Sequence, residues 1–164
     1  MKSPLILLCF FIAIGCTNPE PPTTVILLRH AEKDTDGTED PGLKTEGIAR
    51  VERLKKLLEQ TQIDAIYSTN FKRTRETVAP LASQRDLTVQ SYESFSADDI
   101  EEILERHSGG TVLICGHSNN IPWTANLLIG KEEYKDYKDS EYGILLIVSV
   151  VKKGTNAKVT RLNF

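Results

Sequence analysis

Val25-Ile26-Leu27-Leu28-Arg29-His30 is an apolar run that ends in two polar side chains. A short run of this kind is typical of a strand that is buried on both faces of a sheet. Similar runs follow at residues 63–67, 87–92 and 111–115. Segments with helical spacing alternate with these runs, at residues 45–60, 71–84, 96–107 and 121–129. This alternation predicts an α/β fold with a mostly parallel central sheet flanked by helices on both faces.

Local signals refine the predicted elements. Thr45 is a candidate cap for the first helix, whose expected buried face carries Ile48, Val51, Leu54, Leu57 and Leu58. Pro80 lies inside the second helix and is expected to shorten or bend it. Ser96 begins a pattern typical of a capping box. Residues 144–151 and 158–162 read as a C-terminal antiparallel pair of strands, whereas residues 134–142 show no assignable pattern.

The N-terminal segment has the composition of a targeting signal. Leu5 to Ile14 is an apolar run of ten residues, which is too short for a transmembrane helix of about 20 residues. Gly15 and Cys16 follow this run and resemble the processing site of a bacterial lipoprotein, although Ala13 stands where leucine is usual. A plain signal peptide, or a buried strand that contains a cysteine, is the simpler alternative.

We therefore expect residues 1–15 to be a signal peptide that is cleaved before Cys16, with Cys16 as the lipidation site. Residues 16–23 are rich in proline and polar side chains and read as a tether. Residues 24–164 then form one domain. The expected location is the cell envelope, with the chain anchored by lipid to a bacterial membrane on its periplasmic or surface side.

The charge balance excludes some classes of partner. The chain has 164 residues, with 20 Lys and Arg against 23 Asp and Glu, which gives a net charge of -3. No broad basic field exists for nucleic acid, so any anion site depends on a few local cations. Three cysteines do not make a disulfide framework. No obligate protein partner is evident from the sequence.

Polar clusters follow three of the predicted strands: Arg29-His30, residues 68–75 and residues 116–118. In parallel α/β sheets ligands bind at the carboxyl ends of the strands, so we expect these clusters to converge. Arginine binds phosphate oxygens through two parallel donors, and neutral histidine is a competent nucleophile. Two histidines without a third ligand make a poor metal site. The sequence therefore predicts a phosphate site that requires neither metal nor other cofactor.

Four motifs, in order, resemble those of the histidine phosphatase (phosphoglycerate mutase-like) superfamily. Residues 28–33 (LRHAEK) are similar to its RHG/RHA-E motif, and residues 43–47 (LKTEG) to its LTxxG helix start. Residues 67–77 are similar to its S-x-x-x-x-R-x-x-x-T segment, and residues 116–118 (GHS) to its GHS/GHG motif. The resemblance extends over residues 25–130, and the chain has the size of a small single-domain member.

The resemblance implies a metal-independent phosphatase that hydrolyses phosphomonoesters. His30 would be the phosphorylated nucleophile, and Arg29, Arg73 and His117 would complete the phosphate pocket. The spacing from Ser68 favours Arg73 over Arg75 as the residue of the phosphate pocket. Asn119 lies at a predicted helix N-terminus and is a candidate substrate-binding residue, unless it or Asn120 only caps that helix.

The general acid is the least defined part of the predicted site. Family members place a carboxylate shortly after the third strand, which makes Glu93 the candidate, with Asp98 second because helix capping explains it equally well. Acid-phosphatase relatives place aspartate after the second histidine, where this chain has Ser118. Without an acid, substrates with good leaving groups are favoured. His107, at a helix end, is interpreted as structural.

Two alternatives to a phosphomonoesterase remain open at the level of sequence. One is a protein phosphohistidine phosphatase, which export argues against. The other is a non-catalytic lipoprotein that binds phosphate or another anion in the same pocket. The chain is too short for the insertions of a phosphoglycerate mutase.

Overall fold

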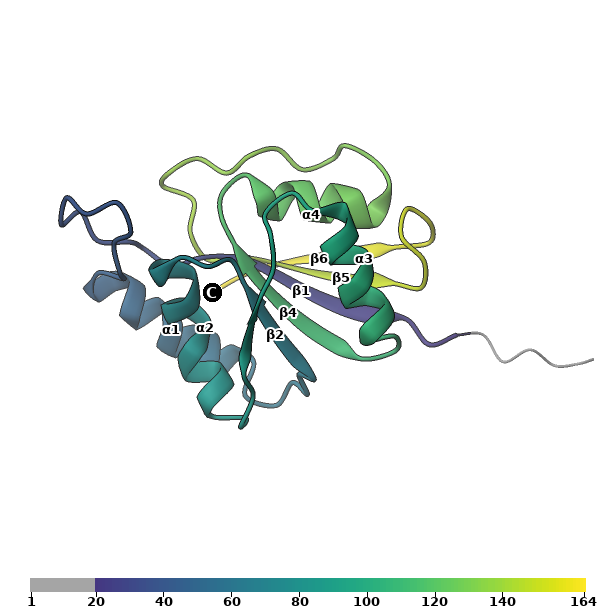
Figure 1. Cartoon of the computed structure of the whole chain (residues 1–164), viewed down its shortest axis with the longest axis horizontal. Coiled ribbons are helices and arrows are strands. Elements are labelled where there is room, and N and C mark those ends of the chain that lie inside the picture. Colours follow the sequence, from purple (N-terminus) through teal and green to yellow (C-terminus); the bar gives the residue numbers. More distant parts are fainter. Residues whose placement is uncertain (1–19) are drawn as a thin grey trace, which may run out of the picture.

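The computed structural model describes residues 20–164 as six strands and four helices around one sheet (Figure 1). The elements are β1 Thr23–Arg29, α1 Thr45–Leu57, β2 Ala65–Ser68, α2 Lys72–Ser83, β3 Val89–Ser91, α3 Ala97–Arg106, β4 Thr111–Gly116, α4 Asn120–Ile129, β5 Ile144–Val150 and β6 Lys158–Asn163. The predicted signal peptide, Cys16 and the first part of the tether lie outside the described residues.

The sheet has the strand order β3-β2-β4-β1-β5-β6. β3, β2, β4 and β1 are mutually parallel, whereas β5 runs antiparallel to both β1 and β6. This arrangement confirms the predicted mostly parallel sheet with a C-terminal antiparallel pair. Arg29 lies opposite Gly116 in the register, and Ser68 lies opposite Cys115. The carboxyl ends of the three central strands therefore meet at one edge.

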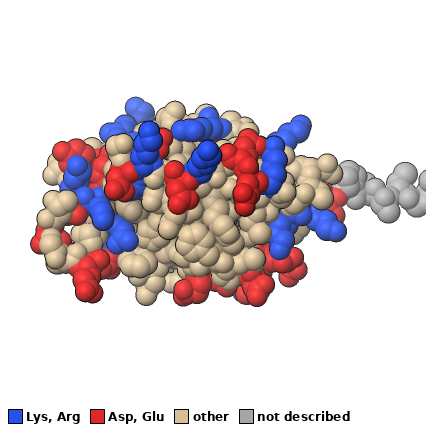
Figure 2. Space-filling model, turned by 90° about the horizontal axis from the view of Figure 1, so that it is seen from above, with Lys and Arg blue, Asp and Glu red and all other residues tan. Residues whose placement is uncertain are grey.

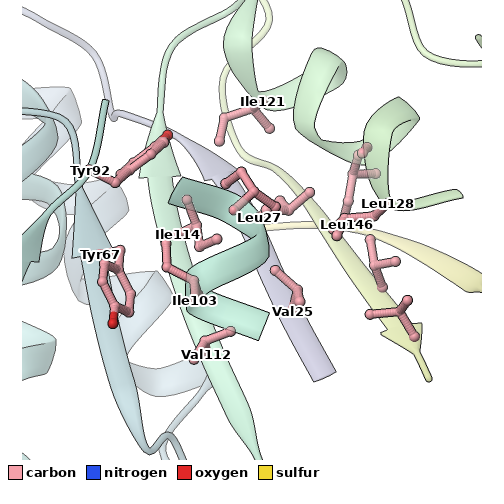
Figure 3. Packing of buried hydrophobic residues seen from close by; sticks show 14 of the residues in the cluster. Val25, Leu27, Tyr67, Tyr92, Ile103, Val112, Ile114, Ile121, Leu128 and Leu146 are labelled. Carbon is pink, nitrogen blue, oxygen red and sulfur yellow. The ribbon is translucent and has the colours of Figure 1, made fainter. Parts of the chain in front are cut away.

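Alternate residues of β1 face opposite sides of the sheet, which explains its continuous apolar sequence. Val25 and Leu27 pack under α3 and α4, against side chains such as Ile103 and Ile121 (Figure 3). Ile26 and Leu28 face the other layer, where they join buried side chains of α1 and α2. Figure 1 shows the same division, with α1 and α2 on one side of the sheet and α3 and α4 on the other.

Some local expectations are confirmed and others are wrong. Ser96 is the N-cap of α3, and its hydroxyl accepts the backbone N–H of Asp99. Thr45 is not a cap, because Lys44 occupies that position without a side-chain hydrogen bond. Thr23, predicted as the last residue of the tether, opens β1 with a buried side chain.

Two further expectations concern the helices. Ile48 and Leu57 of α1 are exposed, because only one narrow stripe of this helix, including Val51 and Leu54, reaches the sheet. Pro80 does not end α2, which continues to Ser83. Residues 134–142, which show no assignable sequence pattern, lie in a loop that spans residues 131–143 and that we call the 131–143 loop. Within residues 20–164 no helix has the length and apolar character needed to cross a membrane.

Candidate active site

The three predicted polar clusters meet at the carboxyl ends of β1, β2 and β4. The backbone N–H of His30 donates to the carbonyl of Gly116 at 2.9 Å, which ties the end of β1 to the end of β4. The rings of His30 and His117 lie edge to face, with their centroids 5.5 Å apart. Together with Arg29, Arg73 and Asn119 they line an open pocket of about 340 Å³. The convergence inferred from strand order is thus present in the structure.

His30 is buried and held in one orientation. Its Nδ1 lies 2.7 Å from the carbonyl oxygen of Ala31, so Nδ1 carries the proton and donates it to that carbonyl. This tautomer leaves the lone pair of Nε2 free. Burial lowers the pKa of His30 from 6.5 to about 3; the hydrogen bond to Ala31 opposes this shift, and the charge of Arg29 adds to it. His30 is therefore neutral, and nucleophilic, across the physiological pH range.

Arg29 joins the pocket to the 131–143 loop. Its Nη1 donates to the carbonyl oxygens of Lys138 and Glu141 at 2.8 and 3.0 Å. Its guanidinium carbon lies 4.1 Å from the ring centroid of Tyr142, in a cation–π arrangement. One side of the guanidinium is thus fully engaged by the protein, and this fixes how its remaining donors point.

Arg73 enters the pocket from the first turn of α2. Its Nη1 contacts the Asp40 carboxylate at 3.3 Å, and its guanidinium lies 4.5 Å from the ring centroid of Phe71. The Nε atoms of Arg29 and Arg73 are both buried and have no hydrogen-bond partner among residues 20–164. Buried donors without partners are rare in folded proteins and call for an explanation. Both guanidinium groups line the pocket, so their positive charges lie beside any oxyanion bound there.

His117 is positioned through two different contacts. Its Nε2 lies 2.9 Å from the hydroxyl of Thr69, at the end of β2, which leaves Nδ1 as the ring nitrogen free for a ligand. Its backbone N–H donates to Oδ1 of Asn120 at 2.6 Å. Burial lowers the pKa of His117 to about 4, and the positive charges of Arg73 and Arg29 contribute. His117 is therefore also neutral near pH 7.

Asn120 connects the loop of His117 to the loop after β3. It is fully buried, and its Nδ2 donates to the hydroxyl of Tyr92 at 2.9 Å. Gly116 is required beside it, because a Cβ at this position would lie 2.4 Å from Oδ1 of Asn120. Sequence reasoning treated Asn120 only as a possible cap and missed this role.

The segment after His30 is fixed from α2 and α1. The hydroxyl of Thr77 accepts the backbone N–H of Ala31 at 2.9 Å. Glu32, which follows Ala31, packs closely against Gly47 of α1. A Cβ at position 47 would lie 2.3 Å from the carbonyl oxygen of Glu32. These contacts explain the glycine and the threonine at the ends of two of the motifs. His107 is the C-cap of α3 and contacts the hydroxyl of Tyr67 at 3.0 Å, away from the pocket.

The structure does not bring Glu93 into the pocket. Its side chain is exposed, and its backbone N–H is bound to the carboxylate of Asp99, while the next two residues, Ser94 and Phe95, line the pocket instead. Asp98 is exposed in the first turn of α3 and also lies outside the pocket lining. The carboxylate that does line the pocket is Asp139, 3.8 Å from Nη2 of Arg29. No sequence signal in the 131–143 loop pointed to it.

Asn119 is both a helix cap and a lining residue of the pocket, and its role in substrate binding stays a prediction. It is the N-cap of α4, where its side chain accepts the backbone N–H of Asn120, and it is exposed at the pocket lining.

No group of three or more His, Cys, Asp or Glu within residues 20–164 is placed to hold a metal ion. Figure 2 shows one face of the molecule, on which charged side chains of both signs are interspersed around an uncharged area. The anion site therefore depends on its local arginines.

The model of the histidine phosphatase superfamily (branch 1) matches residues 25–97. This range contains the first three motifs and ends before His117. No curated protein matches the sequence significantly.

Solved structures of phosphatases have the same fold. The protein histidine phosphatase SixA, complexed with tungstate, has a TM-score of 0.69 at 13% identity, over 85% of this chain and 96% of that one. A mycobacterial glucosyl-3-phosphoglycerate phosphatase has a TM-score of 0.67 at 13% identity, over 87% and 99%. The alpha-ribazole phosphatase of Shigella flexneri has a TM-score of 0.65 at 17% identity, over 86% and 96%.

Proposed function

The chain belongs to the histidine phosphatase superfamily, and we propose that it hydrolyses phosphomonoesters through a phosphohistidine on Nε2 of His30. The observation that carries this proposal is the pair of guanidinium groups, of Arg29 and Arg73, that line one pocket with a neutral histidine. Two guanidinium groups match the charge and the tetrahedral oxygens of a phosphate dianion.

In the first step the lone pair of His30 Nε2 forms a bond to phosphorus, and the bond between phosphorus and the ester oxygen breaks. The ester oxygen leaves with the bonding electrons and takes a proton from water. In the second step a water molecule forms a bond to phosphorus and gives a proton to the hydroxide left by the first step. The P–N bond breaks, its electrons return to Nε2, and neutral His30 is restored. The sum is ester plus water giving alcohol plus phosphate.

The surrounding groups fit the charge that develops during these steps. The attacked imidazole becomes positive, and its Nδ1–H already donates to the carbonyl of Ala31 at 2.7 Å, which stabilises that charge. Arg29 and Arg73 stabilise the phosphoryl oxygens. His117, held by Thr69 and Asn120, offers Nδ1 toward the same group. No step in this scheme passes through a metal ion.

The leaving group receives little help from the protein. Glu93 and Asp98 lie outside the pocket lining, and the side chain of Asp139, which does line the pocket, is fully exposed 3.8 Å from Nη2 of Arg29. A proton donor is typically worth about 10²–10⁴-fold in rate. We therefore expect esters of acidic alcohols to be hydrolysed much faster than alkyl phosphates.

The test is to trap the intermediate. Wild-type protein is mixed with ³²P-labelled 4-nitrophenyl phosphate and quenched with alkali, since a phosphohistidine is stable in alkali and labile in acid. We expect label on the peptide that contains His30, and loss of both label and turnover in His30→Ala. His107→Ala is the matched control, because this histidine is outside the pocket and its loss should leave labelling intact. Label on a serine, or full activity in His30→Ala, would overturn the mechanism.

The same assay separates the two alternatives. A non-catalytic anion-binding protein would bind phosphate without releasing 4-nitrophenol. A protein phosphohistidine phosphatase would turn over a phosphohistidine peptide far faster than any monoester. This second candidate is supported by the fold similarity to SixA.

We further propose that the protein is held at a bacterial membrane by lipid on Cys16, on the periplasmic or surface side. The support is the apolar run that ends at Gly15-Cys16 and the proline-rich segment after it. The chain enters the fold at Thr23, the amino end of β1 (Figure 1). The pocket is lined by Arg29 and His30, at the carboxyl end of the same strand. An anchor at the N-terminus would thus leave the pocket facing away from the attachment point.

A further inference from the structure

Two exposed phenylalanines lie at the same pocket. Six large apolar side chains are exposed among residues 20–164: Ile48, Leu57, Phe71, Phe95, Val151 and Leu162. The two aromatic ones, Phe71 at 40% exposure and Phe95 at 49%, both line the pocket of His30. Single exposed apolar residues are ordinary, but two rings at one phosphate site form a local apolar surface. We call Phe71 and Phe95 the aromatic rim.

Phe71 lies next to the groups that would hold the phosphate. Its ring stands at 90° to that of His117, with the centroids 5.0 Å apart. The guanidinium of Arg73 lies over the ring, 4.5 Å from its centroid. The ring thus contacts both partners, and Phe71 lines the same pocket as His30 and the two arginines.

Phe95 is held in a conformation that its residue type rarely adopts. Its φ is 62°, in the left-handed region that is costly for a bulky side chain. Its ring packs against that of Trp123, with centroids 5.5 Å apart and an interplanar angle of 71°. Ser96, directly after it, is fixed as the N-cap of α3. Strain of this kind is concentrated at binding sites, where it places a side chain that function requires.

Building on the proposed function, we propose that the substrate is a phosphomonoester with a planar aromatic ring bonded directly to the ester oxygen. The phosphate would lie between Arg29 and Arg73, and the ring would pack against the aromatic rim. Aromatic pairs contribute beyond simple burial of area, and they favour a flat ring over a saturated one. The short distance from Phe71 to His117 favours a ring one bond from the ester oxygen over a ring separated by a sugar.

This substrate class also fits the leaving-group chemistry of the pocket. When the P–O bond breaks, the aryl oxygen leaves as a phenolate, whose conjugate acid has a pKa of about 10, as in tyrosine. Such a group departs with little protonation. The aromatic rim and the lack of a well-placed acid thus point to the same substrates through independent observations.

The experiment measures binding of phosphonates, which are not hydrolysed, so that leaving-group reactivity does not enter. Dissociation constants of phenylphosphonate, cyclohexylphosphonate and methylphosphonate are measured by calorimetry on the wild-type chain. We expect phenylphosphonate to bind about three- to tenfold tighter than the other two, a range that corresponds to the known strength of aromatic pairs.

Phe95→Gly is the decisive variant, because glycine adopts the positive φ without strain and the fold should be kept. We expect it to lose the preference for phenylphosphonate, to leave methylphosphonate binding unchanged, and to keep or raise the melting temperature. Asp86→Gly is the matched control. Asp86 also has a positive φ, of 54°, but is exposed in the turn after α2, so the preference should remain. If Phe95→Gly does not fold, Phe95→Asn replaces it, since asparagine tolerates this region.

The possible failures are distinguishable. Equal binding of phenyl- and cyclohexylphosphonate, or an unchanged preference in Phe95→Gly, would overturn the aromatic rim as a specificity element while leaving the phosphate site intact. A preference for adenosine monophosphate over ribose 5-phosphate without one for phenylphosphonate would also overturn it, in favour of nucleotides. Failure of all phosphonates to bind would overturn the phosphate pocket, and with it the proposed function.

Discussion

His30 shows how the environment of one residue sets its chemistry. Two influences on its pKa oppose each other: burial favours the neutral ring, and the hydrogen bond to the carbonyl of Ala31 favours the charged ring. Burial is the larger effect, so the nucleophile is neutral when free. In the proposed mechanism the negative charges of a bound phosphate would face Arg29 and Arg73, and the hydrogen bond to Ala31 would stabilise the positive imidazole that forms. The ring of His30 is thus uncharged before the proposed reaction, and the positive charge that would develop on it during the reaction is stabilised by the carbonyl of Ala31.

At the residue scale we expect Glu93→Gln to change kcat/KM for both phenyl phosphate and an alkyl phosphate by less than about twofold, against about 10²–10⁴-fold for loss of a true general acid. The reason is that its exposed side chain lies outside the pocket lining. Steady-state kinetics on both substrates provides the measurement. A large loss confined to the alkyl substrate would restore Glu93 as the acid and would require the loop after β3 to move.

At the scale of elements, the part of the site that follows from strand order was predictable. Arg29, His30 and His117 lie at strand ends, and parallel strands in register bring their carboxyl ends together whatever the loops do. Arg73 followed from its spacing in the motif at the start of α2. These positions depend on backbone geometry that apolar runs and helical spacing encode.

The supporting contacts were not predictable in the same way. Asp139 and Tyr142 come from the 131–143 loop, which has no periodicity and is held mainly by backbone carbonyls that accept from Arg29. Glu93 was misplaced because a loop can turn between one residue and the next, as the positive φ of Phe95 shows. Asn120 was underestimated because its partners, such as Tyr92, are distant in sequence.

Asn120 carries the prediction at this scale. Asn120→Ala removes the acceptor for the His117 N–H and leaves the buried Tyr92 hydroxyl without its donor. We expect a loss of about 1–3 kcal/mol in the free energy of unfolding, and a fall in kcat/KM as His117 is released. Tyr92→Phe is the matched control, because it removes one hydroxyl and leaves the contact to His117 intact, so kcat/KM should be nearly unchanged. Urea unfolding and kinetics on both variants test this, and equal kinetic losses would contradict it.

At the scale of the whole molecule, the neutral histidines make stability depend on pH. His30 has a pKa of about 3 when folded and about 6.5 when unfolded. Below pH 6.5 the unfolded chain binds a proton that the folded chain does not, so the free energy of unfolding falls as pH drops from 6.5 toward 3. Above pH 6.5 both states are neutral at this residue and it contributes no pH dependence.

We therefore expect the free energy of unfolding to fall less in His30→Asn than in wild type between pH 6.5 and 4.5. The difference between the two decreases should reach up to about 2.5 kcal/mol, because each pH unit is worth about 1.4 kcal/mol per group. The measurement is urea unfolding of both proteins at a series of pH values. The difference between the two curves isolates His30 from the carboxylates, which titrate in both. Parallel curves would mean that folding does not lower the pKa of His30, which would contradict the pH dependence expected here.

The relation between the tether and the pocket carries the last prediction. Thr23 begins β1, while His30 follows its carboxyl end, so the attachment point and the active site lie at opposite ends of one strand. If Cys16 carries the lipid, Cys16→Ala should move the protein from the membrane fraction to the soluble fraction, or leave it unprocessed with a larger mass. Turnover of 4-nitrophenyl phosphate by the detergent-extracted variant should equal that of wild type, because the N-terminal segment joins the fold at Thr23, at the end of β1 opposite to the pocket. Fractionation and intact-mass measurement decide the matter: the same membrane association and the same mass in Cys16→Ala would exclude the lipid anchor, whatever the activity.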